Sequence, residues 1–105
     1  MSCADRVENA ILFRECSGQA TVRAECVPGE ITTGGSAVAE GSKPGPSGST
    51  TTTRILWDRP DPATEETPTA WVALAEATYG YGGPVGSPPP EAETDPVIVY
   101  AVCAS

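Results

Sequence analysis

The chain has no histidine and little positive charge, and both absences limit its possible functions. Its 105 residues include 6 Lys and Arg against 14 Asp and Glu, which gives a net charge of −8. Binding to nucleic acid or to anionic lipid depends on clustered cations. We therefore expect neither a nucleic-acid partner nor a membrane partner. The acidity serves solubility, with recognition of a basic partner as the alternative.

The chain also lacks the usual equipment for catalysis and for metal binding. Without histidine, general acid–base catalysis would fall to carboxylates, which a glycosidase must hold at a fixed separation in a cleft. Two Pro-rich stretches carry most of the candidates, namely Asp58, Asp61, Glu65 and Glu66, then Glu91, Glu93 and Asp95. Such loops are a poor frame for a paired-carboxylate site, and neither a C-x-x-C zinc knuckle nor a calcium-loop register is present. We expect no enzyme, no metal and no cofactor.

Large side chains and long apolar runs are scarce as well. The sequence holds one Phe, two Trp and three Tyr, but 11 Gly and 11 Pro. No apolar run approaches the ~20 residues that span a bilayer. The opening residues 1–6 lack the basic and apolar regions of a signal peptide, so the expectation is either a processed secreted domain or a protein made without Sec export. The abundant turn residues favour a single all-β domain, a small antiparallel β-sandwich of Ig-like or jelly-roll-like type with long Pro/Gly-rich loops.

Alternating hydrophobicity locates the strands. In the segment 20–26, Val22, Ala24 and Cys26 share one face. Strands are expected on this basis at 11–16, 20–26, 31–39, 54–57, 69–78 and 97–103, although 70–77 also contains good helix formers. Gly34 and Gly35 inside a strand predict a bulge or a close backbone approach.

The connections divide the chain. We expect a hairpin at 17–19, a low-complexity stretch at 41–49 that cannot pack a core, and a long loop at 79–96. Loops at 17–19, 40–50 and 79–96 would then lie at one end of the sandwich, and those at 27–30 and 58–68 at the other. Residues 1–19 form an N-terminal arm and first strand, and residues 20–105 form the disulfide-stapled sandwich.

Four cysteines allow three disulfide pairings. We favour Cys26–Cys103 together with Cys3–Cys16, because each pair can meet across neighbouring strands or through a folded-back N-terminal arm. A Cys16–Cys26 bond would contradict this choice. Closing a loop of about 77 residues stabilises by about 4 kcal/mol in the chain-entropy model, a large fraction of the stability of a small domain.

Two groups of residues are candidates for partner contact. Tyr79 and Tyr81 lie among glycines, where they could stack on sugars or anchor a protein, or instead cover the packing of their own loop. The last strand is apolar on both faces, although a sandwich strand needs only one buried face. We therefore expect Ile98, Tyr100 and Val102, on the face opposite Cys103, to meet a neighbouring subunit or the N-terminal arm.

Several short motifs suggest a family. The chain contains Cys26-Val27-Pro28-Gly29, then Thr33-Gly34-Gly35, then Trp71, and closes on Val99-Tyr100-Ala101-Val102-Cys103-Ala104. This pattern, over residues 20–105, resembles a small module of actinobacterial secreted proteins and of phages that infect those hosts. The resemblance implies a β-sandwich whose first and last cysteines pair, with no catalytic role. The long 79–96 loop departs from the pattern.

These observations lead to a functional hypothesis. Extracellular cysteine usage without an export signal fits a virion, which assembles in the cytosol and acts outside it. We expect a non-enzymatic structural protein of a phage virion surface, a capsid decoration or tail-surface subunit that contacts the major capsid protein, a tail protein or copies of itself. The alternative is a secreted actinobacterial cell-surface or carbohydrate-binding module with a glycan partner.

Overall fold

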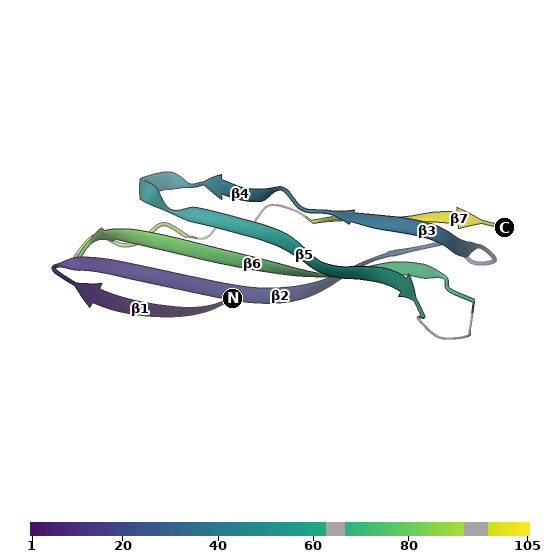
Figure 1. Ribbon diagram of the computed structural model, residues 1–105, viewed down its shortest axis with the longest axis horizontal. Coiled ribbons are helices and arrows are strands. Elements are labelled where there is room, and N and C mark those ends of the chain that lie inside the picture. The colour runs from purple at the N-terminus through teal and green to yellow at the C-terminus, as the bar shows by residue number, and fades with distance from the viewer. Residues whose placement is uncertain (63–66, 92–96) are drawn as a thin grey trace.

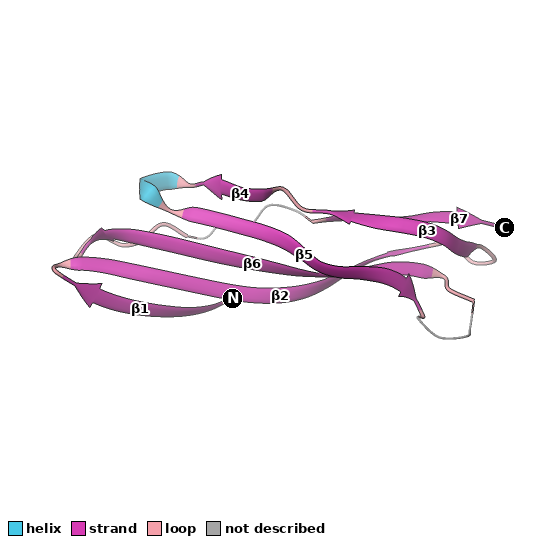
Figure 2. Cartoon of the chain, in the orientation of Figure 1, coloured by secondary structure: helices cyan, strands magenta, loops and turns pink. Residues whose placement is uncertain are grey.

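The computed structural model describes residues 1–62, 67–91 and 97–105, and it consists of two antiparallel β-sheets that pack on each other (Figure 1). The molecule is elongated, with extents of 61 × 21 × 17 Å. The described residues contain no α-helix and only one 3-10 turn, η1 (Pro46–Gly48), which Figure 2 shows at one end. The prediction of a small all-β sandwich is confirmed.

The larger sheet has five strands in the order β1-β2-β6-β5-β4. In that order they are β1 (Ser2–Glu8), β2 (Ile11–Glu25), β6 (Ala70–Pro84), β5 (Thr50–Asp61) and β4 (Gly41–Pro44). The smaller sheet pairs β3 (Ile31–Val38) with β7 (Ile98–Ala104). It lies over one half of the larger sheet, with β3 contacting β5 and β6, and β7 contacting β2 and β6.

The first hairpin differs from the prediction. Strand β2 runs unbroken through residues 17–19 and pairs with β6 along its whole length, so the hairpin expected there is wrong, and the boundary after residue 19 falls inside β2. The chain reverses instead at Asn9 and Ala10, whose φ angles are 50° and 63°. A two-residue hairpin loop with two positive φ angles is a type I′ turn, whose second position normally holds glycine. Because alanine occupies it, the usual sequence signal is missing.

The low-complexity stretch is more ordered than expected. Residues 41–44 form β4, which pairs with β5, and η1 follows directly. Ser49 is buried; its hydroxyl donates to the carbonyl of Pro46 at 2.8 Å, and its own carbonyl accepts from Gly45 N at 2.8 Å. Apart from Ser49, none of residues 41–49 is buried, so the stretch packs no core, as predicted. Strand β4 was not predicted, because the edge pairing and these local hydrogen bonds order the stretch without apolar side chains.

The two sheets approach closely because small residues line their interface. Ala73 and Ala75 of β6 are buried on the face that also carries Trp71. In β3 the pairing with β7 shifts between Thr32 and Gly34, and a Cβ atom on Gly35 would lie 2.4 Å from the Trp71 ring. The bulge and the close approach predicted for the two glycines are both present. Gly35 is therefore the place where β3 admits the largest side chain of β6.

A pair of glycine substitutions tests this contact. Gly35→Ala should lower the free energy of unfolding by about 3 kcal/mol, because its methyl group would overlap the Trp71 ring and the carbonyl oxygen of Tyr100. Gly34→Ala is the matched control: nothing lies within 4 Å of its added Cβ. It should change the free energy by less than about 1 kcal/mol. Urea unfolding of both variants measures this, and equal losses would contradict the packing described.

Candidate interaction surface

The face of the β3–β7 sheet that points away from the larger sheet is exposed and apolar; we call it the outer face. Cross-strand pairing places Ile98 opposite Val38, Tyr100 opposite Ser36, and Val102 opposite Gly34. The large apolar side chains of the outer face, with their exposed fractions, are Ile31 (42%), Val38 (50%), Ile98 (59%), Tyr100 (49%) and Val102 (54%). Single exposed apolar residues are ordinary, but a row of neighbouring ones makes this face a candidate contact surface.

The alternation predicted for the last strand is present. Val99, Ala101 and Cys103 are half-buried, whereas Ile98, Tyr100 and Val102 are exposed. The N-terminal arm does not cover these residues, because β1 pairs with β2 at the edge of the other sheet. That half of the prediction is wrong, while contact with a neighbouring subunit stays a prediction.

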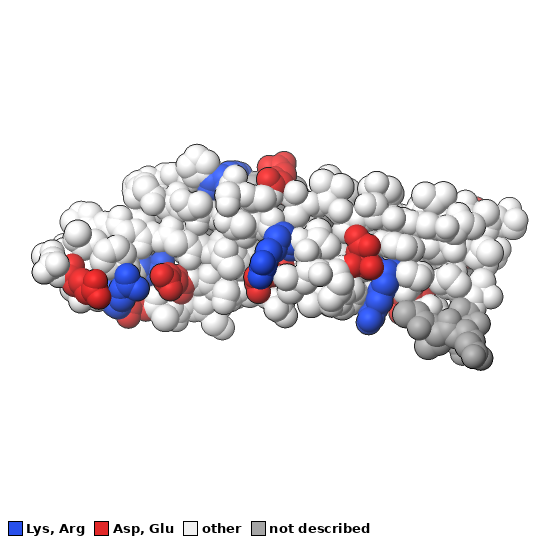
Figure 3. All heavy atoms as spheres, in the orientation of Figure 1, with Lys and Arg blue, Asp and Glu red and all other residues white. Residues whose placement is uncertain are grey.

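The outer face is also free of charge. Neither β3 nor β7 contains an acidic or basic residue. The Lys and Arg side chains all lie on strands of the larger sheet, at Arg6, Arg14, Arg23, Lys43, Arg54 and Arg59. Figure 3 shows the same division, with coloured side chains over the larger sheet and a white surface over β3. A chain of net charge −8 thus presents one neutral apolar face.

The Cys26–Cys103 disulfide fixes the opposite side of β7. Cys26 follows the end of β2, its Cα lies 5.8 Å from that of Cys103, and the prediction of this bond is confirmed. The buried hydroxyl of Thr32 donates to Cys26 Sγ at 3.3 Å, since a disulfide sulfur has no proton to give. The amide of Cys26 donates to the carbonyl of Thr69 at 2.9 Å. The bond therefore ties the larger sheet directly to the strand that bears the outer face.

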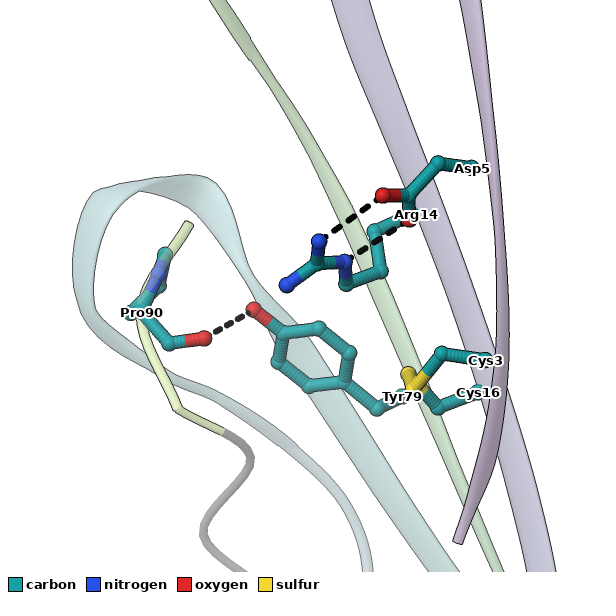
Figure 4. The surroundings of a disulfide bond; sticks show 6 residues. All are labelled: Cys3, Asp5, Arg14, Cys16, Tyr79 and Pro90. Carbon is teal, nitrogen blue, oxygen red and sulfur yellow. Dashed lines mark hydrogen bonds and ion pairs between the residues drawn. A yellow bond between two sulfur atoms is a disulfide. The ribbon is translucent and has the colours of Figure 1, made fainter. Parts of the chain in front are cut away.

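The second predicted disulfide, Cys3–Cys16, is also confirmed. The two residues are direct cross-strand partners in β1 and β2, with Cα atoms 4.0 Å apart (Figure 4). Nearby, Arg14 donates two hydrogen bonds to the carboxylate of Asp5, at 2.7 and 2.8 Å, and these lower the pKa of Asp5 below its ordinary range. The edge strand β1 is thus held to β2 covalently and by an ion pair.

Tyr79 and Tyr81 do not lie on a loop, so their predicted position is wrong. Both belong to β6, are 4% and 6% exposed, and form a buried cluster with Cys16. The Tyr79 hydroxyl donates to the carbonyl of Pro90 at 2.6 Å, which holds the Pro-rich segment against the sheet (Figure 4). The alternative, that the two rings serve internal packing, describes them better. The period-two pattern from Trp71 onward continues to Tyr81 and could have revealed this.

The acidic candidates that the structure describes lie on a strand and beside the Pro-rich segment. Asp58 and Asp61 lie in β5 rather than in a loop, and Asp61 accepts a hydrogen bond from Arg23, which also pairs with Glu25 at 3.0 Å. Within residues 1–62, 67–91 and 97–105, no three His, Cys, Asp or Glu side chains are grouped as metal ligands. Glu91 borders a small hollow beside Lys43 and Ser49. The remaining acidic candidates, Glu65, Glu66, Glu93 and Asp95, lie outside the described residues.

Several hollows lie on the larger sheet, and one of them is lined largely by residues with hydroxyl groups. It has a volume of about 660 Å³ and is open to solvent. Small hydroxyl side chains supply much of its lining, at Ser2, Ser17, Thr50, Thr52 and Thr78. Tyr79 also borders it, but the ring is buried and its hydroxyl is engaged with Pro90. The hollow therefore offers hydrogen-bonding groups without an exposed aromatic platform.

Comparison of the chain with protein families, with curated proteins and with solved structures finds no significant match. Within the part of the chain that the structure describes, no helix has the length and apolarity needed to cross a membrane. The two disulfides indicate an oxidising, extracellular or secreted environment.

The buried Tyr79 phenol gives a testable pH dependence. Burial raises the pKa of Tyr79, so the folded state favours the neutral phenol, and its contribution to stability is lost as the pH rises above the ordinary value of about 10. Tyr79→Phe removes this loss and also the hydrogen bond to Pro90. We expect a stability about 1 kcal/mol lower at pH 7 and a smaller further decline between pH 9 and about 11. Urea unfolding across this range measures both effects.

The control is Tyr100→Phe. Because the Tyr100 ring is exposed, this substitution should lower the free energy of unfolding at pH 7 by less than Tyr79→Phe does. If Tyr79→Phe retained the full stability at pH 7 and the same alkaline decline as the parent chain, the buried hydrogen bond would be refuted.

Proposed function

We propose that the chain is a non-enzymatic structural subunit that acts outside the cell by protein–protein contact through the outer face. The observation that carries this proposal is the row of exposed apolar side chains opposite Cys103, of which Ile98, Tyr100 and Val102 belong to one strand. Apolar area removed from water stabilises an interface by about 25 cal/mol per Å². Because the row lies on paired strands, little backbone entropy is lost when a partner binds.

The setting we propose is the surface of a phage virion, as a capsid decoration or tail-surface subunit. Two disulfides suit a protein that functions under oxidising conditions. The motif pattern that ends at Cys103 resembles modules of phage and actinobacterial secreted proteins. The partner in this proposal is a major capsid protein, a tail protein or another copy of the chain.

A secreted cell-surface or carbohydrate-binding module is the second candidate. The hydroxyl-lined hollow on the larger sheet favours it, because such groups can hydrogen-bond to sugars. Sugar binding by stacking, however, was expected from Tyr79 and Tyr81, and both rings are buried. The structural role is therefore the better supported of the two.

Sedimentation of the native material tests the proposal. We expect the chain to travel with a particle far larger than its own 10.8 kDa. Re-addition of purified chain to particles stripped of it should restore binding, and Val102→Lys should abolish that binding by placing a charge on the outer face. Val7→Lys, at an exposed position on β1, is the matched control and should bind normally.

Two results would overturn the proposal. One is native chain that sediments alone. The other is glycan-array binding that Thr52→Ala in the hollow abolishes and Val102→Lys leaves intact, which would favour the carbohydrate-binding alternative.

A further inference from the structure

We infer that the partner of the outer face is the outer face of a second copy of this chain, in a twofold face-to-face dimer. This inference rests on the proposed function only in taking the outer face as a contact surface. It adds the identity of the occupant and the direction of the symmetry axis.

Charge is the first argument for a second copy. The acidity of the chain would draw a basic partner to the larger sheet, whereas the outer face offers such a partner no carboxylate. A partner that fits the outer face must present a neutral and apolar surface to it. The outer face of a second copy is such a surface. Two copies that meet through it keep their charged sheets on the outside of the pair. The acidic residues next to β3, Glu30 and Glu40, lie beyond its two ends, where solvent screens them.

Shape is the second argument. On β7 the outer side chains are large, at Ile98, Tyr100 and Val102, and form a ridge. Their cross-strand partners in the middle of β3 are small: Ser36 lies opposite Tyr100, and Gly34 opposite Val102. The middle of β3 therefore carries smaller side chains than the ridge, and we call this strip the groove. At its bulge the exposed Thr33 adds one hydroxyl, which donates to the carbonyl of Val102 at 3.2 Å. One surface carries both halves of a complementary pair, which is the requirement for an isologous interface.

The ridge and the groove also fix the symmetry axis. A twofold axis parallel to the strands places β7 of one copy over β3 of the other, at the same height along the strands. Tyr100 then faces Ser36 of the second copy, and Val102 faces its Gly34. An axis across the strands would set ridge against ridge and leave the groove empty. The packing inferred is thus an aligned sheet-on-sheet contact, with the sheets about 10 Å apart.

The size of the outer face sets the strength of the pair. Two strands of seven and eight residues, at about 3.4 Å per residue and about 4.8 Å between strands, span roughly 25 × 10 Å. This is well below the ~800 Å² per partner of a standard stable interface. The dimer is accordingly weak in dilute solution, and it forms readily where copies are held close together, because their effective concentration is high.

Sedimentation equilibrium of the intact, disulfide-bonded chain tests the inference between about 10 µM and about 1 mM, a range that brackets weak association. The average mass should rise from 10.8 kDa toward twice that value. Tyr100→Glu and Ser36→Arg should each hold the mass at that of the monomer. Their equimolar mixture should regain association, because one opposite-charge pair and one native Tyr100–Ser36 pair then form across the interface.

Val7→Glu, on the exposed edge strand β1, is the control and should associate as the parent does. A monomeric mass at every concentration overturns the inference, and so does undiminished association of Tyr100→Glu or a mixture that stays monomeric. Circular dichroism of each variant verifies that it is folded. If the chain stays monomeric but still binds particles, only the dimer is rejected and the proposed function stands. If the chain dimerises but never binds a particle, the proposed virion role is rejected and the dimer stands.

Discussion

The Cys26–Cys103 bond is the constraint on which the arrangement of the two sheets depends. The larger sheet is largely built from strands joined by turns or long antiparallel pairings, whereas β3 and β7 come from distant parts of the chain. A two-stranded sheet is marginal by itself and must be held by what lies beneath it. Beneath this one lie small alanines, and one large contact, Trp71 against Gly35. The disulfide fastens the small sheet where apolar packing is thin.

The same constraint explains why an apolar face can be presented to solvent. The alternation along β7 means that fixing Cys103 inward forces Tyr100 and Val102 outward. Exposing these apolar side chains to water is unfavourable. The closed disulfide nevertheless keeps β7 from shifting its register by one residue, which would turn them inward. The contact that we propose is accordingly made by side chains on paired strands, whose backbone is already ordered before a partner binds.

The sequence predicted what depends on local pattern and failed where distant pairing decides. The alternation of β7 and the close approach at Gly35 follow from residue types at fixed spacing. The two disulfides were chosen among three possible pairings, on the expectation that each pair meets across neighbouring strands or through a folded-back arm. Ser17, Gly18 and Gln19 have turn chemistry, yet they form strand because β6 supplies a partner along the whole of β2, which no local signal records. Tyr79 and Tyr81 were misplaced for a related reason: the glycines between and after them suggested a loop, although their spacing continued a strand.

Amide hydrogen exchange tests the central claim most directly. It should be measured for the parent chain and for the double variant Cys26→Ala/Cys103→Ala. Removing this disulfide lowers the free energy of unfolding by about 4 kcal/mol in the chain-entropy model. We expect exchange in β3 and β7 to accelerate by at least about tenfold more than exchange in the β2–β6 pairing, because only the small sheet loses its covalent link. Equal acceleration in both sheets, or unchanged protection of Ile98–Ala104, would contradict it.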